Sequence, residues 1–278
     1  MTVGEKISER RESLGMTQQE LAEQVFVSEE VIRAWESDQF LPEGNCYARI
    51  ADALQISVKE LFETESKPSW TVKDRMFSES RMFTRLKTLA QVEHLDQTWK
   101  ALSYAQNMHK GGVRKANKFN PEIEIPYIIH PLMMACHAHA LGIRSDEVLT
   151  VILLHDVCED CDVKAFELPF SESVQHSVAL LTKYEGQTTE EYYEGIANDS
   201  TAAIVKALDR CNNISTMASA FSRKKMIEYV DETEKYVYPL LQKIKDDYMD
   251  YSDAIYVIKY QILSVIETVK AMIMQAKA

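Results

Sequence analysis

Apolar residues recur every three or four positions along almost the whole 278-residue chain, which is the spacing of one face of an α-helix. The pattern predicts helices near 82–91, 96–108, 128–141, 146–157, 172–183, 189–197, 200–218, 223–245 and 253–276. With eight Gly and seven Pro, the chain is also poor in the turn residues that an all-β fold requires. The sequence therefore predicts an all-α protein.

Five shorter helices are expected in residues 1–65. Capping boxes, in which a hydroxyl residue and a glutamate three positions later bond each other's backbone N–H groups, are predicted at Thr17–Glu20 and Ser57–Glu60. Ser28 is expected to cap the third helix, and Asn45 to begin the fourth. We expect a domain over 1–65, a linker over 66–79 with no clear periodicity, and a helical bundle over 80–278.

The first domain resembles the Cro/XRE helix-turn-helix family through residues of its caps, core and turn. The matching positions are Thr17, Leu21, Ala22, Val27, Ser28, Ile32, Trp35, Glu36, Pro42, Ile50, Ala51, Leu54, Leu61 and Phe62. One departure is that Ser37, Asp38 and Gln39 stand where the family has a glycine after Trp-Glu. The resemblance implies a five-helix fold whose third helix would enter the DNA major groove.

Charge opposes DNA binding by this domain. Residues 1–65 hold six Lys and Arg against fourteen Asp and Glu, so they carry −8 of the total charge of −12. The third helix would place Glu29 near phosphates, and an acidic surface works against the counterion release that drives DNA affinity. We interpret the domain as a regulatory or homodimer-forming unit. DNA contact through Gln18, Ser28, Glu29 and Arg33 is the alternative.

Polar residues interrupt apolar helices at three separate places in the second domain. His130 follows Tyr-Ile-Ile, His155 and Asp156 end the run Val-Ile-Leu-Leu, and Asp209 lies within Lys-Ala-Leu-Asp-Arg. Two imidazoles and two carboxylates suit Mn, Fe, Co, Ni or Zn better than Ca. Such an ion lowers the pKa of a bound water and polarises a phosphoryl oxygen. A lone buried His is more often a hydrogen-bonded core residue than a ligand. The prediction of a metal site therefore depends on the occurrence of His, then His-Asp, then Asp, each at the edge of an apolar helix.

The set of His, then His-Asp, then Asp resembles the HD metal-dependent phosphohydrolase superfamily. The similarity is closer to the hydrolase domain of RelA/SpoT proteins, in the order of the small stand-alone alarmone hydrolases. It covers most of residues 80–245, through the segments Ala105–Lys115, Tyr127–Pro131, Leu153–Asp160, Leu181–Lys183, Lys206–Met217 and Tyr236–Leu240.

This resemblance implies hydrolysis of the 3′-pyrophosphate of ppGpp or pppGpp, which gives GDP or GTP and pyrophosphate in the stringent response. It implies Mn²⁺ bound by the four ligands above. It also implies that Glu159 and Asp160, one turn after the His-Asp pair, are the catalytic acidic pair. Arg114, Lys115 and Asn213 match family positions that line the nucleotide pocket.

Further cations near the motifs fit an anionic nucleotide. Lys183, Lys206 and Arg210 are candidates for substrate binding, although a solvated charge or a structural ion pair explains Lys183 and Arg210 equally well. For His109 we favour a pocket or structural role over that of a fifth metal ligand.

Several features leave the substrate open. Residues 116–126 form a longer insertion than is usual in the family, so an adenine alarmone stays an alternative to a guanine one. Cys158 and Cys161 have redox or zinc spacing but lack a second pair, so we interpret them as packing residues. The rivals are an HD hydrolase of another nucleotide, such as a nucleoside monophosphate, and a regulator that senses a nucleotide without turnover. No nucleotide-transfer domain is expected after residue 245.

We expect a cytoplasmic protein without membrane contact. Five Cys is an odd number, which fits a reducing compartment. The first fifteen residues lack the apolar core of a secretory signal, and no apolar run approaches the roughly 20 residues that span a bilayer.

Overall fold

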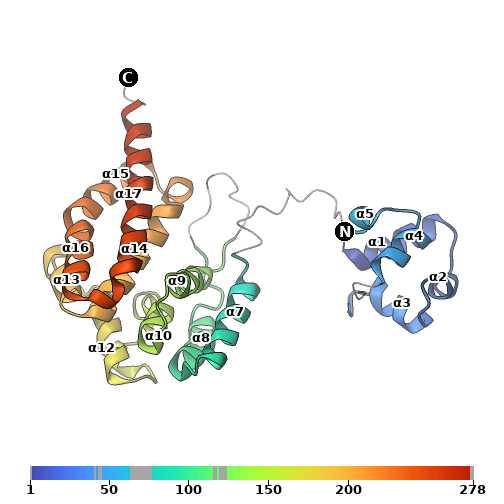
Figure 1. Ribbon diagram of the computed structural model, residues 1–278, viewed down its shortest axis with the longest axis horizontal. Coiled ribbons are helices and arrows are strands. Elements are labelled where there is room, and N and C mark those ends of the chain that lie inside the picture. Colours follow the sequence, from blue (N-terminus) through green and yellow to red (C-terminus); the bar gives the residue numbers. More distant parts are fainter. Residues whose placement is uncertain are drawn as a thin grey trace. The chain divides into compact units, whose positions relative to one another are not determined.

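The computed structural model describes residues 2–40, 42, 46–62, 77–114, 118 and 124–275. The chain divides into two compact units, Met1–Arg75 and Met76–Ala278, and each is described by itself (Figure 1). Within the described residues the regular structure is helical, and one isolated antiparallel bridge joins Val113 to Pro126. The predicted all-α class is confirmed.

Five short helices surround a small apolar core in the first unit. They are α1 (Val3–Ser13), α2 (Gln18–Val25), α3 (Glu29–Glu36), α4 (Tyr47–Ala53) and α5 (Val58–Phe62). The core side chains are Ile7, Leu21, Ala22, Val25, Ile32, Trp35, Cys46, Ile50, Leu54 and Leu61. Both predicted capping boxes are confirmed. The Glu20 backbone N–H donates to Thr17 Oγ1 at 3.1 Å, and the Glu60 N–H donates to Ser57 Oγ at 3.0 Å.

One predicted cap of the first unit differs in the structure, and another falls outside the described residues. Ser28 occupies the N-cap position of α3 with extended backbone, but its hydroxyl makes no capping hydrogen bond. The fourth helix begins at Tyr47 after Cys46, whereas Asn45 lies outside the described residues. The Cys46 side chain makes no capping hydrogen bond, and Cys46 and Ile50 are both buried in the core.

Asp38 takes over the position where the related family has glycine. Its backbone has a positive φ of 53°, which aspartate tolerates better than most residues. Its carboxylate accepts hydrogen bonds from the Gly4 N–H at 3.1 Å and the Thr2 hydroxyl at 2.6 Å. A Cβ at Gly4 would lie 2.3 Å from the Trp35 carbonyl oxygen, so glycine is required there. These contacts join the start of α1 to the end of α3.

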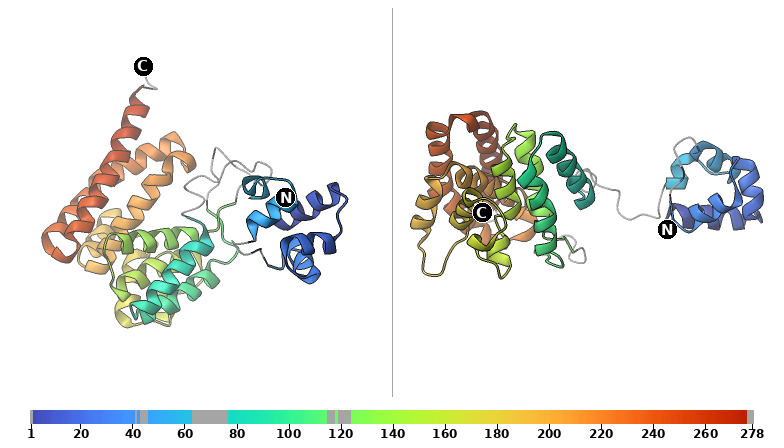
Figure 2. Two further views of the ribbon diagram at one scale, coloured as in Figure 1. Left: turned by 45° about the vertical axis from the view of Figure 1, so that its right-hand side comes forward. Right: turned by 90° about the horizontal axis from the view of Figure 1, so that it is seen from below.

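The second unit is a bundle of longer helices (Figures 1 and 2). In chain order they are α7 (Glu79–Val92), α8 (Asp96–Met108), α9 (Ile129–Ala140), α10 (Asp146–Leu154), α11 (Val157–Asp160), α12 (Glu172–Leu181), α13 (Thr189–Ala197), α14 (Ser200–Ala220), α15 (Arg223–Glu232), α16 (Tyr238–Asp247) and α17 (Ser252–Gln275). Short 3₁₀ turns, η1 (Ala165–Glu167) and η3 (Met249–Tyr251), and a π-helical turn, η2 (Thr233–Val237), complete the unit.

Two helices form the centre of this bundle. α10 packs against α8, α9, α12 and α14, and every residue from Val148 to Leu154 is buried. α14 packs against α9, α10, α12, α13, α16 and α17. The start of α10 also caps α8, because the Asp146 carboxylate accepts the backbone N–H groups of Gln97 at 3.0 Å and Thr98 at 2.7 Å. This central pair positions the polar residues discussed below.

Two predicted helices are interrupted. The helix expected over 146–157 ends at Leu154, and a new turn, α11, begins at Val157. The helix expected over 223–245 contains the π-helical turn Thr233–Val237 just before Pro239. Proline lacks the N–H that would bond one turn back, and its ring crowds that carbonyl, so a wider turn relieves the conflict.

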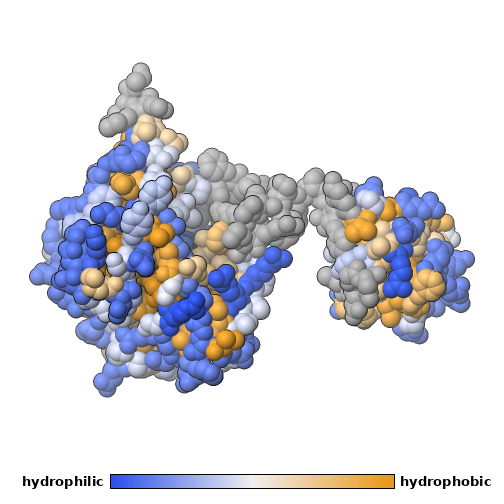
Figure 3. All heavy atoms as spheres, in the orientation of Figure 1, coloured by the Kyte–Doolittle hydropathy of each residue, from blue (hydrophilic) through white to orange (hydrophobic). Residues whose placement is uncertain are grey.

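The apolar face predicted for the last helix is confirmed. Ile255, Ile258, Ile262 and Ile266 are buried on the side of α17 that packs against α14 and α16. Figure 3 shows hydrophilic residues over much of the visible surface of this unit, with hydrophobic residues gathered along α17. Among the described residues, no helix has the length and apolar content needed to cross a membrane.

We expect Ile262→Ala to lower the free energy of unfolding by about 2–5 kcal/mol, because it opens a cavity at a fully buried position. Leu263→Ala is the matched control, since Leu263 is 43% exposed and its loss should cost less than about 1 kcal/mol. Urea unfolding followed by circular dichroism measures both. Equal losses in the two variants would contradict the described packing of α17.

Candidate metal centre

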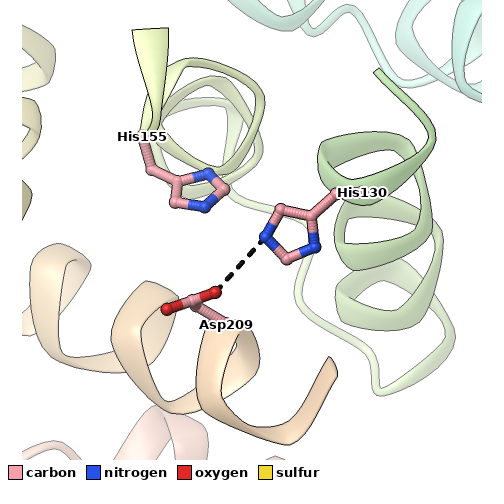
Figure 4. A group of neighbouring side chains, drawn as sticks. All are labelled: His130, His155 and Asp209. Atoms are coloured by element: carbon pink, nitrogen blue, oxygen red, sulfur yellow. Dashed lines mark ion pairs between the residues drawn. The ribbon is translucent and has the colours of Figure 1, made fainter. Parts of the chain in front are cut away.

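The predicted metal ligands come from three parts of the central bundle. His130 lies in the first turn of α9, and Asp209 lies within α14. His155 and Asp156 occupy the break between α10 and α11, where the buried helix ends. Figure 4 shows the two imidazoles and the Asp209 carboxylate pointing toward one another.

All four predicted ligands lie close together. One ligand atom each from His130, His155 and Asp209 lies within 4.8 Å of the others. The Nε2 atom of His130 is 3.3 Å from Asp209 Oδ1. Asp156 Oδ2 is 3.1 Å from His155 Nε2 and 3.6 Å from His130 Nε2. His130, His155 and Asp209 are only 2%, 4% and 7% exposed, so these polar groups converge inside the bundle.

Hydrogen bonds on the outer nitrogens orient both imidazoles. His130 Nδ1 lies 2.8 Å from the side-chain oxygen of Asn212, and His155 Nδ1 lies 2.8 Å from the backbone oxygen of Ile152. Both partners can only accept, so each Nδ1 carries the proton. In the neutral rings, each Nε2 then presents a lone pair to the centre, which is the orientation a metal requires.

Opposite charges perturb the titration of the cluster. Burial alone lowers the pKa of His155, but the Asp156 carboxylate outweighs it and raises that pKa from 6.5 to about 9. Burial alone raises the pKa of Asp156 and Asp209, yet both are held below the ordinary 3.8. The His155 imidazole has this effect on Asp156, and the Lys206 ammonium on Asp209. Positive charge at the centre is therefore favourable.

The donor set fits a borderline divalent cation. Within the described residues, the buried Nε2 of His155 makes no hydrogen bond, and the Asp156 carboxylate lies 3.1 Å from it. A metal that displaces the proton from this nitrogen would meet both groups. Two imidazole nitrogens with two carboxylates form the mixed set that such ions accept. The described residues therefore include a group able to hold a metal, formed by His130, His155 and Asp209, and the Asp156 carboxylate lies beside it.

Cationic side chains reach the same centre. Arg114 donates to the side-chain oxygen of Asn213 at 2.9 Å, and the Asn213 amide donates in turn to Asp209. The Lys206 ammonium lies 3.1 Å from Asp209 Oδ2. The structure thus brings Arg114, Lys206 and Asn213 to the cluster, whereas Lys115 lies outside the described residues.

The predicted acidic pair lies at the exposed side of the centre, on α11. Both Glu159 and Asp160 are exposed. Glu159 accepts the backbone N–H of Lys183 at 2.9 Å, which ties α11 to the end of α12. The Lys183 ammonium itself donates to Thr189 at 3.2 Å and is exposed, so it lies beside the acidic pair rather than at the ligands.

Arg210 is placed differently from its predicted substrate-binding role. Its guanidinium is buried, donates to Tyr193 at 2.8 Å and forms an ion pair with Glu232. It also lies over the ring of Tyr229, 3.9 Å from the ring centroid. Because neighbouring residues on a helix diverge by about 100°, Arg210 points away while Asp209 points to the centre. Of the two alternatives from the sequence, the structural ion pair is the one observed.

Sequence reasoning gave no individual role to two residues that contact the ligands. Asn212 orients His130, and the Tyr127 hydroxyl donates to Asp156 Oδ2 at 2.6 Å. Both lie inside segments that carry the family resemblance. For Asn212, the sequence offered one indication of this role, which is an amide side chain three positions after Asp209 on the same helix. The partner of Tyr127 is 29 residues away, so no local pattern indicates it.

A cavity of about 610 Å³ lies near the centre without including its ligands. It is lined by Glu79, Gln106, His109, Gly112, Glu124 and Ile128, among others. His109 is therefore a wall of this cavity, in line with the pocket or structural role expected for it. The candidate site is the ligand cluster rather than this cavity, because the imidazoles and carboxylates able to hold a metal gather in the cluster.

In the first unit, the candidate DNA-contacting side chains mostly bond one another or neighbouring acids. Gln18 donates to Glu36 at 2.7 Å, and Arg33 pairs with Glu29 at 2.8 Å on α3. Glu36 also holds the buried Arg11 at 2.6 Å. Gln18 and Arg33 are thus engaged within the unit.

The chain is similar to a known family in its first unit and to known proteins over a longer stretch of its sequence. The helix-turn-helix family matches residues 7–61. The guanosine-3′,5′-bis(diphosphate) 3′-pyrophosphohydrolase of Aquifex aeolicus is 29% identical over 162 residues, covering 55% of this chain and 22% of that protein. The protein of the same name from Vibrio cholerae is 30% identical over 214 residues, covering 68% and 29%. A GTP pyrophosphokinase of Myxococcus xanthus is 29% identical over 166 residues, covering 54% and 21%.

The helix-turn-helix match and the observed helices together confirm an all-α architecture of a helix-turn-helix followed by a helical bundle. The chain spans less than a third of the length of the relatives quoted. The HD-type assignment stays a prediction.

The pKa of His155 predicts that the metal-free protein loses stability at alkaline pH. Its pKa rises from 6.5 to about 9 on folding, so the stabilisation is full below 6.5 and is lost as the pH rises through 9. The thermal midpoint in EDTA, followed by circular dichroism, should fall over that window. Asp156→Asn removes the main charged partner and should flatten the dependence. Identical pH profiles for the variant and the parent would contradict the assignment.

Proposed function

We propose that the second unit hydrolyses the 3′-pyrophosphate of ppGpp or pppGpp, giving GDP or GTP and pyrophosphate. The observation that carries the proposal is the convergence of His130, His155, Asp156 and Asp209 from three separate helical segments. The names of the relatives point to the same substrate class. An enzyme is favoured over a nucleotide sensor because the acidic pair needed for turnover accompanies the ligands.

A divalent cation such as Mn²⁺, held by these four residues, would lower the pKa of a water molecule and polarise a phosphoryl oxygen. Glu159 and Asp160, exposed on α11, then orient the attacking water and accept its proton. The attack forms a bond from the water oxygen to phosphorus and breaks the bond to the 3′ oxygen of the ribose. Pyrophosphate leaves, and the 3′ hydroxyl takes up a proton.

The chain's own cations offset the charge of the substrate. Lys206 lies beside Asp209, and Arg114 is held near it through Asn213. Fixed positive groups of this kind stabilise charge that develops on phosphoryl oxygens, because they need no rearrangement during the reaction. We assign Arg114, Lys115, Lys206 and Asn213 to nucleotide binding. Lys183 would lie at the edge of the nucleotide site.

For the first unit we propose a regulatory or dimer-forming role. The supporting observation is that Arg33 and Gln18, the cationic and amide groups expected to reach phosphate, are paired with Glu29 and Glu36. DNA binding would have to break these interactions and then overcome the charge of −8. The unit therefore suits contact with protein better than contact with DNA.

The full-length protein with Mn²⁺ should release pyrophosphate from ppGpp, and EDTA should stop the reaction. Asp156→Ala removes one ligand and should lower kcat at least about 100-fold with the helical content preserved. Asp231→Ala, in α15, is the matched control and should retain turnover. Release is measured with a coupled pyrophosphate assay.

A nucleotide panel makes the substrate assignment testable. It includes ppGpp, pppGpp, the corresponding adenine alarmones and nucleoside monophosphates. Turnover of the adenine compounds alone would transfer the proposal to that class. If no member of the panel is turned over with Mn²⁺ bound, the hydrolase proposal is wrong and the nucleotide-sensor alternative remains.

Charge reversal on α3 tests the role of the first unit. The parent protein should show no binding to duplex DNA that weakens with salt, whereas Glu29→Lys combined with Glu30→Lys should create such binding. Fluorescence anisotropy at several salt concentrations measures both. Salt-dependent binding by the parent would contradict the proposal, and sedimentation of the chain with and without residues 1–65 tests the dimer.

A further inference from the structure

Tyr127 contacts the candidate ligand Asp156 from outside the ligand set. Its hydroxyl donates to Asp156 Oδ2 at 2.6 Å. The same oxygen lies 3.1 Å from His155 Nε2 and 3.6 Å from His130 Nε2. A carboxylate oxygen has two lone pairs. The hydroxyl engages one, which leaves the other for the centre between the imidazoles.

Nothing in its own helix orients the Asp156 carboxylate. Asp156 stands at the N-cap position of α11, where an aspartate usually bonds the backbone N–H groups of the first turn. Here it makes no capping hydrogen bond. The side chain is therefore turned away from its helix toward the cluster, and the Tyr127 hydroxyl is the uncharged donor that holds it there.

His109 and the backbone hold Tyr127 in place. The two rings stack with their centroids 4.8 Å apart and an interplanar angle of 28°. The Tyr127 N–H donates to the Gly112 oxygen at 2.9 Å, and the Gly112 N–H donates to the His109 oxygen at 3.0 Å. A Cβ at Gly112 would lie 3.2 Å from the His109 oxygen and 3.4 Å from Tyr127 Cβ. Glycine thus allows the close approach.

His109 is suited to this supporting role. It is 6% exposed, and its Nε2 has no hydrogen-bond partner among the described residues. The contacts that link His109 to Tyr127 are the ring stacking and the backbone turn. A residue that supports Tyr127 through its flat face needs no polar contact from its ring.

We propose that Tyr127 is a positioning residue that presents Asp156 to a divalent cation, with His109 as its support. The inference deepens the proposed function and rests on its metal centre, but not on the identity of the substrate. Partners that orient metal ligands typically contribute 10–100-fold in metal affinity. The Tyr127 hydroxyl should contribute within that range.

Calorimetric titration with Mn²⁺ alone tests the proposal on the full-length protein. Tyr127→Phe keeps the stacked ring and removes the hydroxyl, so the affinity for Mn²⁺ should fall about 10–100-fold. Tyr248→Phe is the matched control. It removes a hydroxyl that donates to the Ala197 carbonyl at 3.1 Å, and its Mn²⁺ affinity should equal that of the parent. Turnover of Tyr127→Phe should recover most of its kcat as Mn²⁺ is raised.

Substitutions at His109 provide an independent test. His109→Phe retains a flat ring and should keep the affinity for Mn²⁺ near that of the parent, whereas His109→Ala should lower it. In a Tyr127→Phe background, His109→Ala should add little, because both act through the same hydroxyl. Additive losses would show that His109 acts by another route.

The outcomes separate this inference from the proposed function. Unchanged Mn²⁺ affinity in both Tyr127→Phe and His109→Ala, with the parent binding Mn²⁺, overturns the positioning role. Normal Mn²⁺ binding without turnover overturns the hydrolase proposal and leaves the positioning role supported. No Mn²⁺ binding by the parent overturns both. Thermal midpoints of every variant distinguish lost folding from lost metal affinity.

Discussion

A carboxylate buried within α14 is the constraint on which the candidate site depends. Asp209 is almost completely enclosed, and an unpaired buried charge is costly. Lys206, Asn213 and His130 surround it with an ammonium, an amide and an imidazole. Such groups can be supplied only from fixed positions in the packed bundle. The order of the site therefore derives from the packing of α14, and a cation at the centre would offset the remaining negative charge.

The helix α10 ends at Leu154, where the apolar core meets the buried charge of Asp209. Every residue of α10 from Val148 to Leu154 is buried, and only Thr150 among them is polar, so this part of the helix lies in the middle of the bundle. Where it ends, His155 and Asp156 follow directly, and their side chains join His130 and Asp209. The short helix α11 then carries Glu159 and Asp160, which are exposed although the buried His155 precedes them by only a few positions.

Local patterns account for what the sequence could predict. The helices and the capping boxes at Thr17 and Ser57 follow from periodicity and from the spacing of hydroxyl residues and glutamates. Polar residues at the ends of apolar runs indicated the four candidate ligands, and three of them form a group able to hold a metal. Three features could not be predicted in this way. They are the missing capping hydrogen bond of Ser28, the π-helical turn before Pro239 and the choice between the two roles considered for Arg210. They depend on contacts that form only in the folded chain. Glu232, for example, is 22 residues from Arg210, so helical phase alone could not reveal the ion pair.

The uneven charge of the chain bears on both units. With −8 in the first 65 residues and −4 in the rest, neither unit attracts a polyanion through its net charge. Recognition of a nucleotide must therefore come from cations at short range. In the proposed function, Arg114 and Lys206 supply these cations, since Asn213 binds Arg114 beside Asp209 and Lys206 pairs with Asp209 directly. The first unit has the opposite arrangement, since Arg33 is paired with Glu29 on its own helix. The same acidic excess thus permits an anion site in the second unit, where cations gather at a buried centre, and opposes one on α3.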